Sequence, residues 1–167
     1  YGKDSSRTKY RQLYKDKVLG NEGASLYKKV LLPDGTKRSL TREELEDPTL
    51  IPHGSKTYGL DNLTSQGNAS TDQTFNWKGK TYSPGKANHW KCKFPEGLER
   101  LIELGRVEST SGDKLAYVRY FNDFPVFPLA NTWTDTLGQN QFGGDKLYVV
   151  QTGIEVIKRC ILMTTDP

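Results

Sequence analysis

The chain has 167 residues, of which 34% are hydrophobic and 26% are charged, and its formal net charge is +4. This composition is typical of one polar globular domain, and no apolar run approaches the ~18 residues that a transmembrane helix requires. The first residues contain no initiator methionine and no apolar signal stretch. We therefore expect an excised segment of a cytoplasmic protein that does not enter a membrane.

The positive charge is concentrated in two stretches of the sequence. Residues 75–93 contain five lysines and no acid, which gives +5, and residues 1–17 contain six bases and two acids, which gives +4. The remainder of the chain is therefore net negative. Mild basicity alone says little about partners, but charge gathered in this way indicates where phosphates would be contacted.

The spacing of apolar residues over residues 5–17 predicts a helix. Three cations recur every four residues along a neighbouring face of it: Arg7, Arg11 and Lys15. Like charges in a row repel one another unless an anion lies across them. The row is either a solvated helix face or a phosphate contact, and we keep both interpretations.

Residues 27–40 predict a hairpin with Pro33-Asp34-Gly35 as its turn, and a capping-box pattern at Thr41 opens a short helix that ends before Pro48. Residues 58–73 are polar and have few apolar anchors, which predicts a long loop. Its amide side chains are candidates for pairing with adenine in the major groove: Asn62, Gln66, Asn68 and Gln73.

A second hairpin is predicted over residues 75–82, with a Lys-Gly turn between aromatic residues. Its lysines and a third nearby are candidate phosphate contacts: Lys78, Lys80 and Lys91. The aromatic residues of this region favour core or hairpin packing over a stacking surface for a displaced base: Trp77, Tyr82 and Trp90.

Pro95 opens a predicted helix whose apolar stripe is Leu98, Leu101, Ile102 and Leu104, and Gly105 is its C-cap. A third hairpin is predicted from 106–109 and 114–121, a strand over 146–150, and a last helix over 154–163. The fold class is therefore α+β, with short antiparallel hairpins and interspersed helices in a single compact domain with a long polar loop.

A catalytic constellation is not found in the sequence. It contains no Gly-x-Gly-x-x-Gly, no phosphate-binding Gly-x-x-x-x-Gly-Lys-Ser/Thr loop and no Gly-x-Ser-x-Gly elbow. His53 in a polar loop and His89 beside an aromatic residue are typical of surface or packed histidines. Cys92 and Cys160 are expected as reduced thiols, and the inventory has no zinc-site spacing. We assign no catalytic residue and no metal ligand.

The last third of the chain contains Asn-Thr-Trp-Thr-Asp-Thr from Asn131, a Gly-rich gap, and Tyr-Val-Val-Gln-Thr-Gly from Tyr148 leading into the last helix. These features resemble amino-group DNA methyltransferases of the branch whose catalytic motif precedes its cofactor motif. In that branch W-x-D is followed by Y-P-T-Q-K-P and a helix of the form L-L-x-R-I-I. The matching positions are Trp133, Asp135, Tyr148, Gln151, Val156, Ile157, Arg159 and Ile161.

The Lys-Tyr-Arg-Gln-Leu run from Lys9 is also similar to this family. The resemblance implies an enzyme that moves a methyl group from S-adenosylmethionine to an exocyclic amino group of adenine or cytosine. It makes residues 1–130 the DNA target-recognition region and 131–167 the segment that leads into the cofactor-binding motif. Gln151 and Thr152 are its cofactor-binding candidates, although Thr152 and Gly153 stand where the family has Lys and Pro.

The catalytic motif and the Gly-rich cofactor loop of that family are both missing from this sequence, so we expect the chain alone to be inactive and to bind no cofactor. The expected partner is double-stranded DNA, with a dimer or a restriction subunit as a further partner. Two alternatives stay open: a protein-interaction module of a restriction-modification complex, and an RNA-binding domain.

Overall fold

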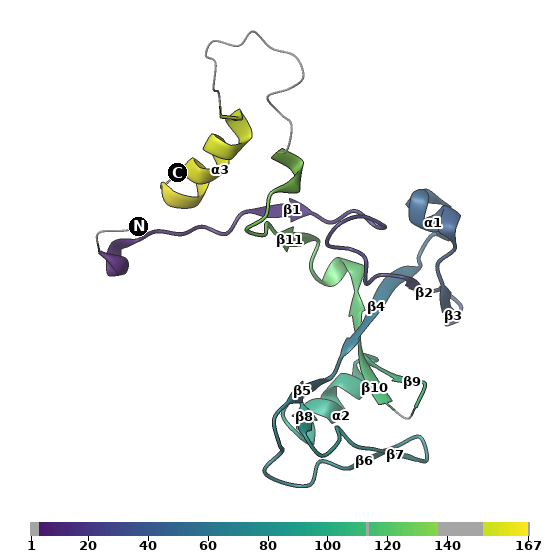
Figure 1. Cartoon of the computed structure of the whole chain (residues 1–167). Helices are drawn as coiled ribbons and strands as arrows, with labels where there is room; N and C mark the ends of the chain where they lie inside the picture. Colours follow the sequence, from purple (N-terminus) through teal and green to yellow (C-terminus); the bar gives the residue numbers. More distant parts are fainter. Residues whose placement is uncertain (1–3, 113, 137–151, 167) are drawn as a thin grey trace. The chain divides into compact units, whose positions relative to one another are not determined.

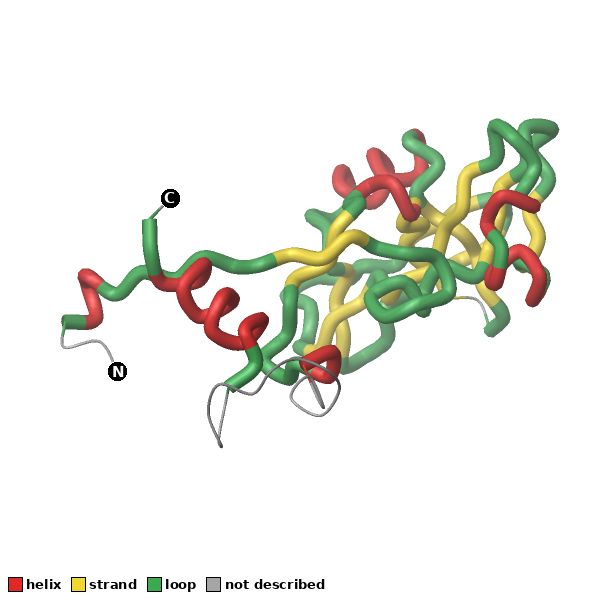
Figure 2. The backbone as a smooth tube through the Cα atoms, turned by 90° about the horizontal axis from the view of Figure 1, so that it is seen from above, coloured by secondary structure: helices red, strands yellow, loops and turns green. Residues whose placement is uncertain are grey.

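The computed structural model describes residues 4–112, 114–136 and 152–166, which form two compact units (Figure 1 and Figure 2). Unit 2 is Lys17–Pro125, and unit 1 joins residues 1–16 to residues 126–167. Antiparallel strands and helices alternate along the chain, which confirms the α+β class. The division into two units replaces the single compact domain that the sequence predicted.

A five-stranded antiparallel sheet runs through unit 2 with the strand order β3-β2-β4-β10-β9 (Figure 1). Its strands are β2 (Lys29–Leu31), β3 (Lys37–Ser39), β4 (Lys56–Asn62), β9 (Val107–Thr110) and β10 (Lys114–Tyr120). The β2–β3 and β9–β10 pairs confirm two of the predicted hairpins.

The central strand β4 lies where the sequence predicted a loop, and that prediction is wrong. Tyr58 and Gly59 are buried, and β4 pairs with β10 from Tyr58↔Tyr120 to Asn62↔Ala116. A Cβ on Gly59 would lie 2.6 Å from the Leu26 carbonyl oxygen, so glycine is required for the close approach of that main chain. The true loop is shorter, because residues 64–66 form another strand.

Two small sheets complete the strand structure of unit 2. β5 (Thr64–Gln66) pairs with β8 (Asn88–Trp90), and β6 (Phe75–Trp77) pairs with β7 (Lys80–Tyr82). In the β6–β7 turn both central residues have positive φ, 51° at Lys78 and 74° at Gly79, which is the type I′ conformation of two-residue hairpins. The predicted second hairpin is confirmed.

The two helices of unit 2 confirm the predicted start signals. In α1 (Arg42–Glu46), Glu44 accepts hydrogen bonds from the Arg38 guanidinium at 2.6 and 2.7 Å and from the Thr41 amide at 2.9 Å, and these lower the pKa of its carboxyl to about 2. In α2 (Glu96–Glu103), which ends ahead of Gly105 (φ 65°), Leu98 is buried. Leu104 is 54% exposed, so its predicted place in the apolar stripe is wrong.

Unit 2 has two hydrophobic clusters. The Trp90 cluster consists of Leu63, Tyr82, Trp90, Leu98, Val107 and Leu115. The Tyr27 cluster consists of Leu19, Ala24, Tyr27, Val30 and Leu40. Burying each large side chain contributes about 1.5–3 kcal/mol relative to exposure, so both clusters stabilise the unit. The Trp90 cluster includes Tyr82 of β7 and Trp90 of β8, and it therefore anchors the lysine-rich stretch, residues 75–93.

In unit 1, β1 (Tyr14–Asp16) pairs with β11 (Val126–Pro128), and α3 (Ile154–Thr164) confirms the last predicted helix. The helix predicted over 5–17 is wrong, because only a 3₁₀ turn at Ser5–Arg7 is helical. Beyond that turn the backbone bonds to distant chain instead: the Arg11 amide donates to the Met163 carbonyl at 2.9 Å. The predicted strand over 146–150 lies outside the described residues.

The large apolar side chains of unit 1 do not form a buried cluster among the described residues. None of the residues with a buried hydrophobic side chain belongs to this unit, and α3 buries none of its residues. Within the ranges that the structure describes, no helix combines the length and the apolar character needed to cross a bilayer.

Candidate nucleic-acid interface

The lysine-rich stretch is held in place by aromatic packing. Tyr82 and Trp90 are buried and Trp77 is half-buried, which confirms that these rings pack rather than form an open stacking surface. The Trp90 amide and indole N–H both donate to Gln73, to its side-chain and main-chain oxygens, each at 2.9 Å. Gln73 therefore fixes Trp90, and its side-chain oxygen is already used within the fold.

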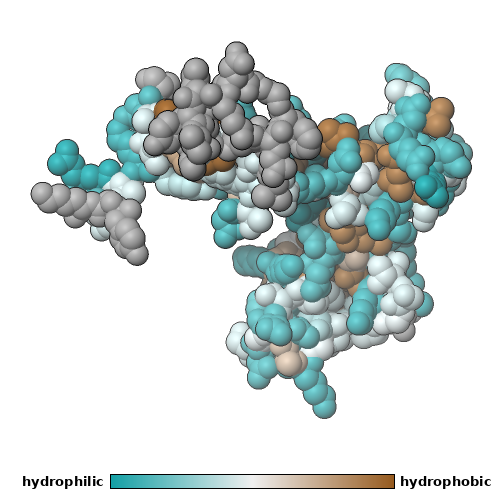
Figure 3. Space-filling view, turned by 45° about the horizontal axis from the view of Figure 1, so that its top comes forward, coloured by the Kyte–Doolittle hydropathy of each residue, from teal (hydrophilic) through white to brown (hydrophobic). Residues whose placement is uncertain are grey.

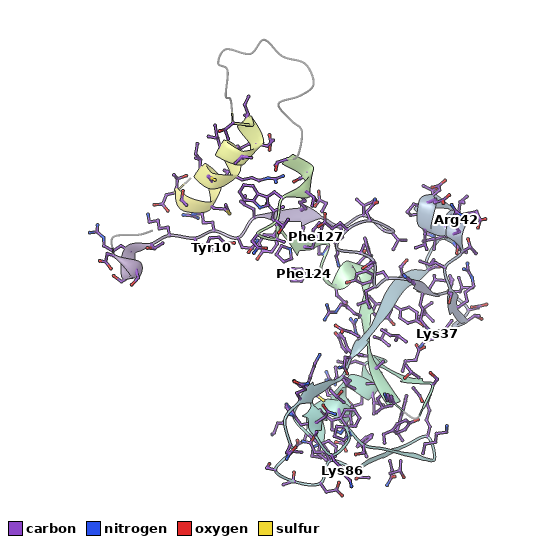
Figure 4. All side chains as sticks on the ribbon, in the orientation of Figure 1. Tyr10, Lys37, Arg42, Lys86, Phe124 and Phe127 are labelled. Atoms are coloured by element: carbon purple, nitrogen blue, oxygen red, sulfur yellow. The ribbon has the colours of Figure 1, made fainter. Side chains whose placement is uncertain are left out.

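The lysines of this stretch lie on the β6–β7 hairpin and in the turns that follow. Lys78, Lys86 and Lys91 are exposed, and none of the three makes an ion pair with a residue that the structure describes. Lys93 lies 3.8 Å from Glu96, and both side chains are mostly exposed. Lys80 is also exposed. Figure 4 places Lys86 at the opposite end of unit 2 from Arg42.

Most of the cations elsewhere in unit 2 have carboxylate partners. Glu108 accepts from Lys29 and Lys37 at 3.2 and 3.0 Å, Asp123 accepts from Arg106 at 2.5 and 2.8 Å, and Asp61 lies 2.6 Å from Arg119. The acid next to the lysine-rich stretch, Asp72, accepts from the Thr74 hydroxyl and amide, which lower the pKa of its carboxyl. Lys78, Lys86 and Lys91 are therefore among the cations of unit 2 that have no carboxylate partner in the described residues.

The surface around these lysines is polar. Hydrophilic and neutral side chains cover most of this end of unit 2 on the face that Figure 3 shows. Beside Lys91 lies a cleft of about 210 Å³ whose polar lining includes Asp61, Tyr117 and Arg119. Cys92 also lines it, and burial raises the pKa of its thiol, which disfavours the thiolate form.

The four predicted base-reading amides have different roles in the structure. Asn62 accepts from the Thr64 amide at 3.0 Å and hydroxyl at 2.9 Å, which closes the turn from β4 into β5. Like Gln73, Asn62 uses its side-chain oxygen as an acceptor within the fold. Gln66 and Asn68 are exposed beside that turn, with no side-chain hydrogen bond to any described residue. They are the two amides of the set that remain open to a ligand.

Each histidine lies in or beside a turn of unit 2. His89 Nδ1 lies 3.0 Å from the Gly67 carbonyl oxygen and so ties β8 to the turn after β5. His53 is exposed in a turn closed by the Ser55 amide, which donates to the Pro52 carbonyl at 3.1 Å. Among the residues that the structure places, no group of three or more His, Cys, Asp or Glu side chains is arranged to hold a metal ion.

Two of the three predicted cations of unit 1, Arg11 and Lys15, pair with carboxylates of the same unit. Asp166 pairs with Lys9 and Arg11, and Asp135 pairs with Lys15 and Arg159. These contacts lower the pKa of both carboxyls. The anion expected across the row is therefore a carboxylate of the protein. Arg7, in the 3₁₀ turn, is exposed and makes no ion pair with a described residue.

The resemblance-bearing residues of unit 1 contact one another. The Arg159 guanidinium donates to both Asp135 oxygens at 2.9 and 2.6 Å and lies 5.3 Å from the centre of the Trp133 ring. Gln12 Nε2 donates to the Leu129 carbonyl at 3.0 Å. Of the cofactor candidates, Gln151 lies outside the described residues, and Thr152 is exposed ahead of α3.

Two polar residues of the β6–β7 hairpin were missed by the sequence analysis. Asn76 and Thr81 stand directly opposite each other on the side of the hairpin away from the Trp90 cluster. The signal was present in the run Phe-Asn-Trp, since a side chain between two core-facing aromatics points outward, and the two-residue turn sets Thr81 opposite Asn76.

Comparisons with protein-family models, curated proteins and solved structures gave no significant match.

Proposed function

We propose that the chain is the DNA target-recognition part of a site-specific amino-group DNA methyltransferase and contacts duplex DNA through its lysine-rich stretch. One observation carries the proposal: Lys78, Lys86 and Lys91 lie on a frame of buried aromatic side chains, exposed and without acidic partners among the described residues. Amines held in this way neutralise phosphates and release counterions, which is the main source of affinity for DNA.

The resemblance supports the parent enzyme. Trp133, Asp135 and Arg159, which match the family pattern, form one contact group, and the Lys-Tyr-Arg-Gln-Leu run belongs to the same unit. In the parent, S-adenosylmethionine would supply the methyl group and an adenine or cytosine amine would accept it, in the cytoplasm. Thr152 offers a single exposed hydroxyl, which does not make a cofactor site.

The test is binding of the 167-residue chain to duplex DNA and to duplex RNA of the same sequence, followed by fluorescence anisotropy across a salt series. We expect DNA binding whose log K falls linearly with log salt. The triple variant K78Q/K86Q/K91Q should reduce that slope by roughly 2.7, which is 0.9 for each lost phosphate contact. The charge-matched control is K28Q/R42Q/K56Q, which changes exposed cations near the Tyr27 cluster.

Three results would reject the proposal. They are binding to neither duplex, a preference for the RNA, and an equal loss of slope in both triple variants. The enzyme part has its own test in the coding sequence on either side of this segment. We expect an Asp-Pro-Pro-Tyr-like motif upstream and a Gly-rich cofactor motif downstream, and a reading frame with neither would remove the methyltransferase assignment while leaving DNA binding intact.

A further inference from the structure

The β6–β7 hairpin has one anchored face and one open face. Phe75 pairs with Tyr82 and Trp77 with Lys80 across the hairpin, and the aromatic members pack on the Trp90 cluster. The Trp77 and Tyr82 ring centres lie 6.2 Å apart. Because side chains alternate along a strand, the intervening pair of residues points the other way. That pair is Asn76 and Thr81, and both are exposed.

The open face carries an amide whose oxygen has a hydrogen-bond partner. The Thr81 hydroxyl donates to Asn76 Oδ1 at 2.7 Å. With Oδ1 turned toward this hydroxyl, the NH₂ group lies on the other side of the amide. Oδ1 has two lone pairs, so one acceptor position remains beside the two donors of the NH₂ group. Asn76 therefore presents a donor and an acceptor side by side to solvent.

A donor and an acceptor in this arrangement match one base edge in the major groove. Adenine presents the N7 acceptor next to the N6 amino donor, and an asparagine amide pairs with both at once. Guanine presents two acceptors at the same place and would leave Oδ1 facing an acceptor. An amide in this orientation would therefore distinguish adenine from guanine.

The hairpin also has the dimensions and charge of a groove-reading ribbon. Two strands about 4.8 Å apart fit within a major groove about 12 Å wide. Lys78, at the tip, has its amine 4.6 Å from the Trp77 ring centre. A cation at the tip would meet the phosphates that line the groove while the amide faces the bases.

Resting on the proposed function, we propose that Asn76 is a specificity-determining residue that reads an adenine in the major groove, and that Thr81 is the positioning residue that orients its amide. This goes beyond the phosphate contacts, because it assigns one base of the recognised site to one side chain. Removal of Asn76 should relax the choice at one base pair and leave affinity for unrelated duplexes nearly unchanged.

The experiment is selection of bound duplexes from a pool with a randomised central segment, using the full chain and sequencing the bound fraction. The wild type should enrich a site that contains at least one fixed A·T pair. In N76A the preference at that pair should fall by about 5- to 150-fold, which corresponds to about 1–3 kcal/mol. N21A is the matched control, since Asn21 is an exposed asparagine beside the Tyr27 cluster.

Thr81 is tested by a pair of variants. T81V keeps the β-branched shape and removes the hydroxyl, so preference at the same pair should weaken, whereas T81S keeps the hydroxyl and should retain it. A merely structural role for Thr81 would lower the melting temperature of T81V and move no base preference. Circular dichroism of each variant establishes that it is folded before selection.

The outcomes separate the two proposals. Failure of the wild type to retain any duplex would reject DNA binding itself. Retention of duplexes with an enriched site that N76A leaves unchanged would overturn the role of Asn76 alone. Retention without any fixed A·T pair in the wild type would overturn it as well. Loss of one A·T position in N76A, with the site intact in N21A, is the result that supports it.

Discussion

Residues 4–16 and residues 75–93 both concentrate positive charge, but they are held in place by different forces. In the first stretch Arg11 and Lys15 pair with the carboxylates of Asp166 and Asp135, and no apolar side chain is buried. In the second stretch Tyr82 and Trp90 are buried, and the lysines stand around them in solvent. A run of cations in the sequence can therefore form ion pairs within the protein, or it can form an exposed surface that is open to a ligand.

This difference in ion pairing indicates which cations can exchange their hydration shell for a phosphate contact. A lysine that already faces a carboxylate must lose that pair before it contacts DNA, and the carboxylate left behind would repel the phosphate. A lysine without such a partner loses only hydration and counterions. We therefore place the phosphate contacts at Lys78, Lys86 and Lys91 rather than at Arg11 and Lys15.

The largest expected effect is on stability. Trp90→Ala should destabilise unit 2 by about 3–5 kcal/mol, because it removes a large side chain that is 3% exposed. Tyr14→Ala, in the other basic stretch, should change stability by no more than about 0.5 kcal/mol, since Tyr14 is 54% exposed. Urea unfolding followed by circular dichroism measures both. Similar losses in the two variants would show that both stretches depend on a buried core.

The next effect is on DNA affinity. K78Q/K86Q/K91Q should weaken duplex binding about a hundredfold at ~0.15 M salt, from three lost contacts. K9Q/R11Q/K15Q changes the same number of charges but removes cations that face Asp135 and Asp166, so it should weaken binding far less. Anisotropy titrations under one salt condition compare them. A greater loss in the second triple would reverse the assignment of the DNA face.

A smaller effect tests the central strand that supports the lysine-rich stretch. Gly59→Ala should cost about 1–3 kcal/mol, because the new Cβ would lie 2.5 Å from Leu26 Cγ and 2.6 Å from the Leu26 carbonyl oxygen. Gly35→Ala is the control at a surface turn, where the new Cβ would meet nothing within 4 Å, and its cost reflects only φ of +86°. A neutral Gly59→Ala would favour the loop that the sequence predicted.

The sequence predicted the elements whose signals are local. Pro33-Asp34-Gly35 and Lys78-Gly79 fix their turns by backbone preference, and the capping pattern at Thr41 fixes the start of α1. The strand β4 was not predicted from the sequence. Its burial depends on neighbouring strands and on the main chain at Leu26, and neither is local in sequence. A structureless loop of that length inside a compact domain was itself an argument for another element.

One local signal at the candidate site was available and unused. An Asp or Asn followed two residues later by Thr closes a turn in which the side-chain oxygen accepts from the threonine amide. The pattern recurs at Asp34-x-Thr36, Asp47-x-Thr49, Asn62-x-Thr64 and Asp72-x-Thr74. It would have marked Asn62 as a turn residue in advance. The carboxylate partners of Arg11 and Lys15 were beyond prediction, since Asp166 and Asp135 lie 155 and 120 residues away.

The smallest effect concerns acid, and it reports on the ion pairs of unit 1. Hydrogen bonds from Arg159 and Lys15 hold the pKa of Asp135 below its ordinary value of 3.8. A carboxyl whose pKa is lower in the folded chain contributes stability above the ordinary value and loses it as pH falls through the lowered one. Because the indole of Trp133 lies against Arg159, its NMR signal should shift in that range, below pH 3.8.

Trp90, in unit 2, provides the internal reference and should stay unchanged until global unfolding. Asp135→Asn removes the titrating group, so the acid shift of Trp133 should disappear while the spectrum of Trp90 is retained. A Trp133 signal that is indifferent to pH in the wild type would show that Asp135 does not hold Arg159 on the ring, and the pairing that distinguishes the first basic stretch from the second would be lost.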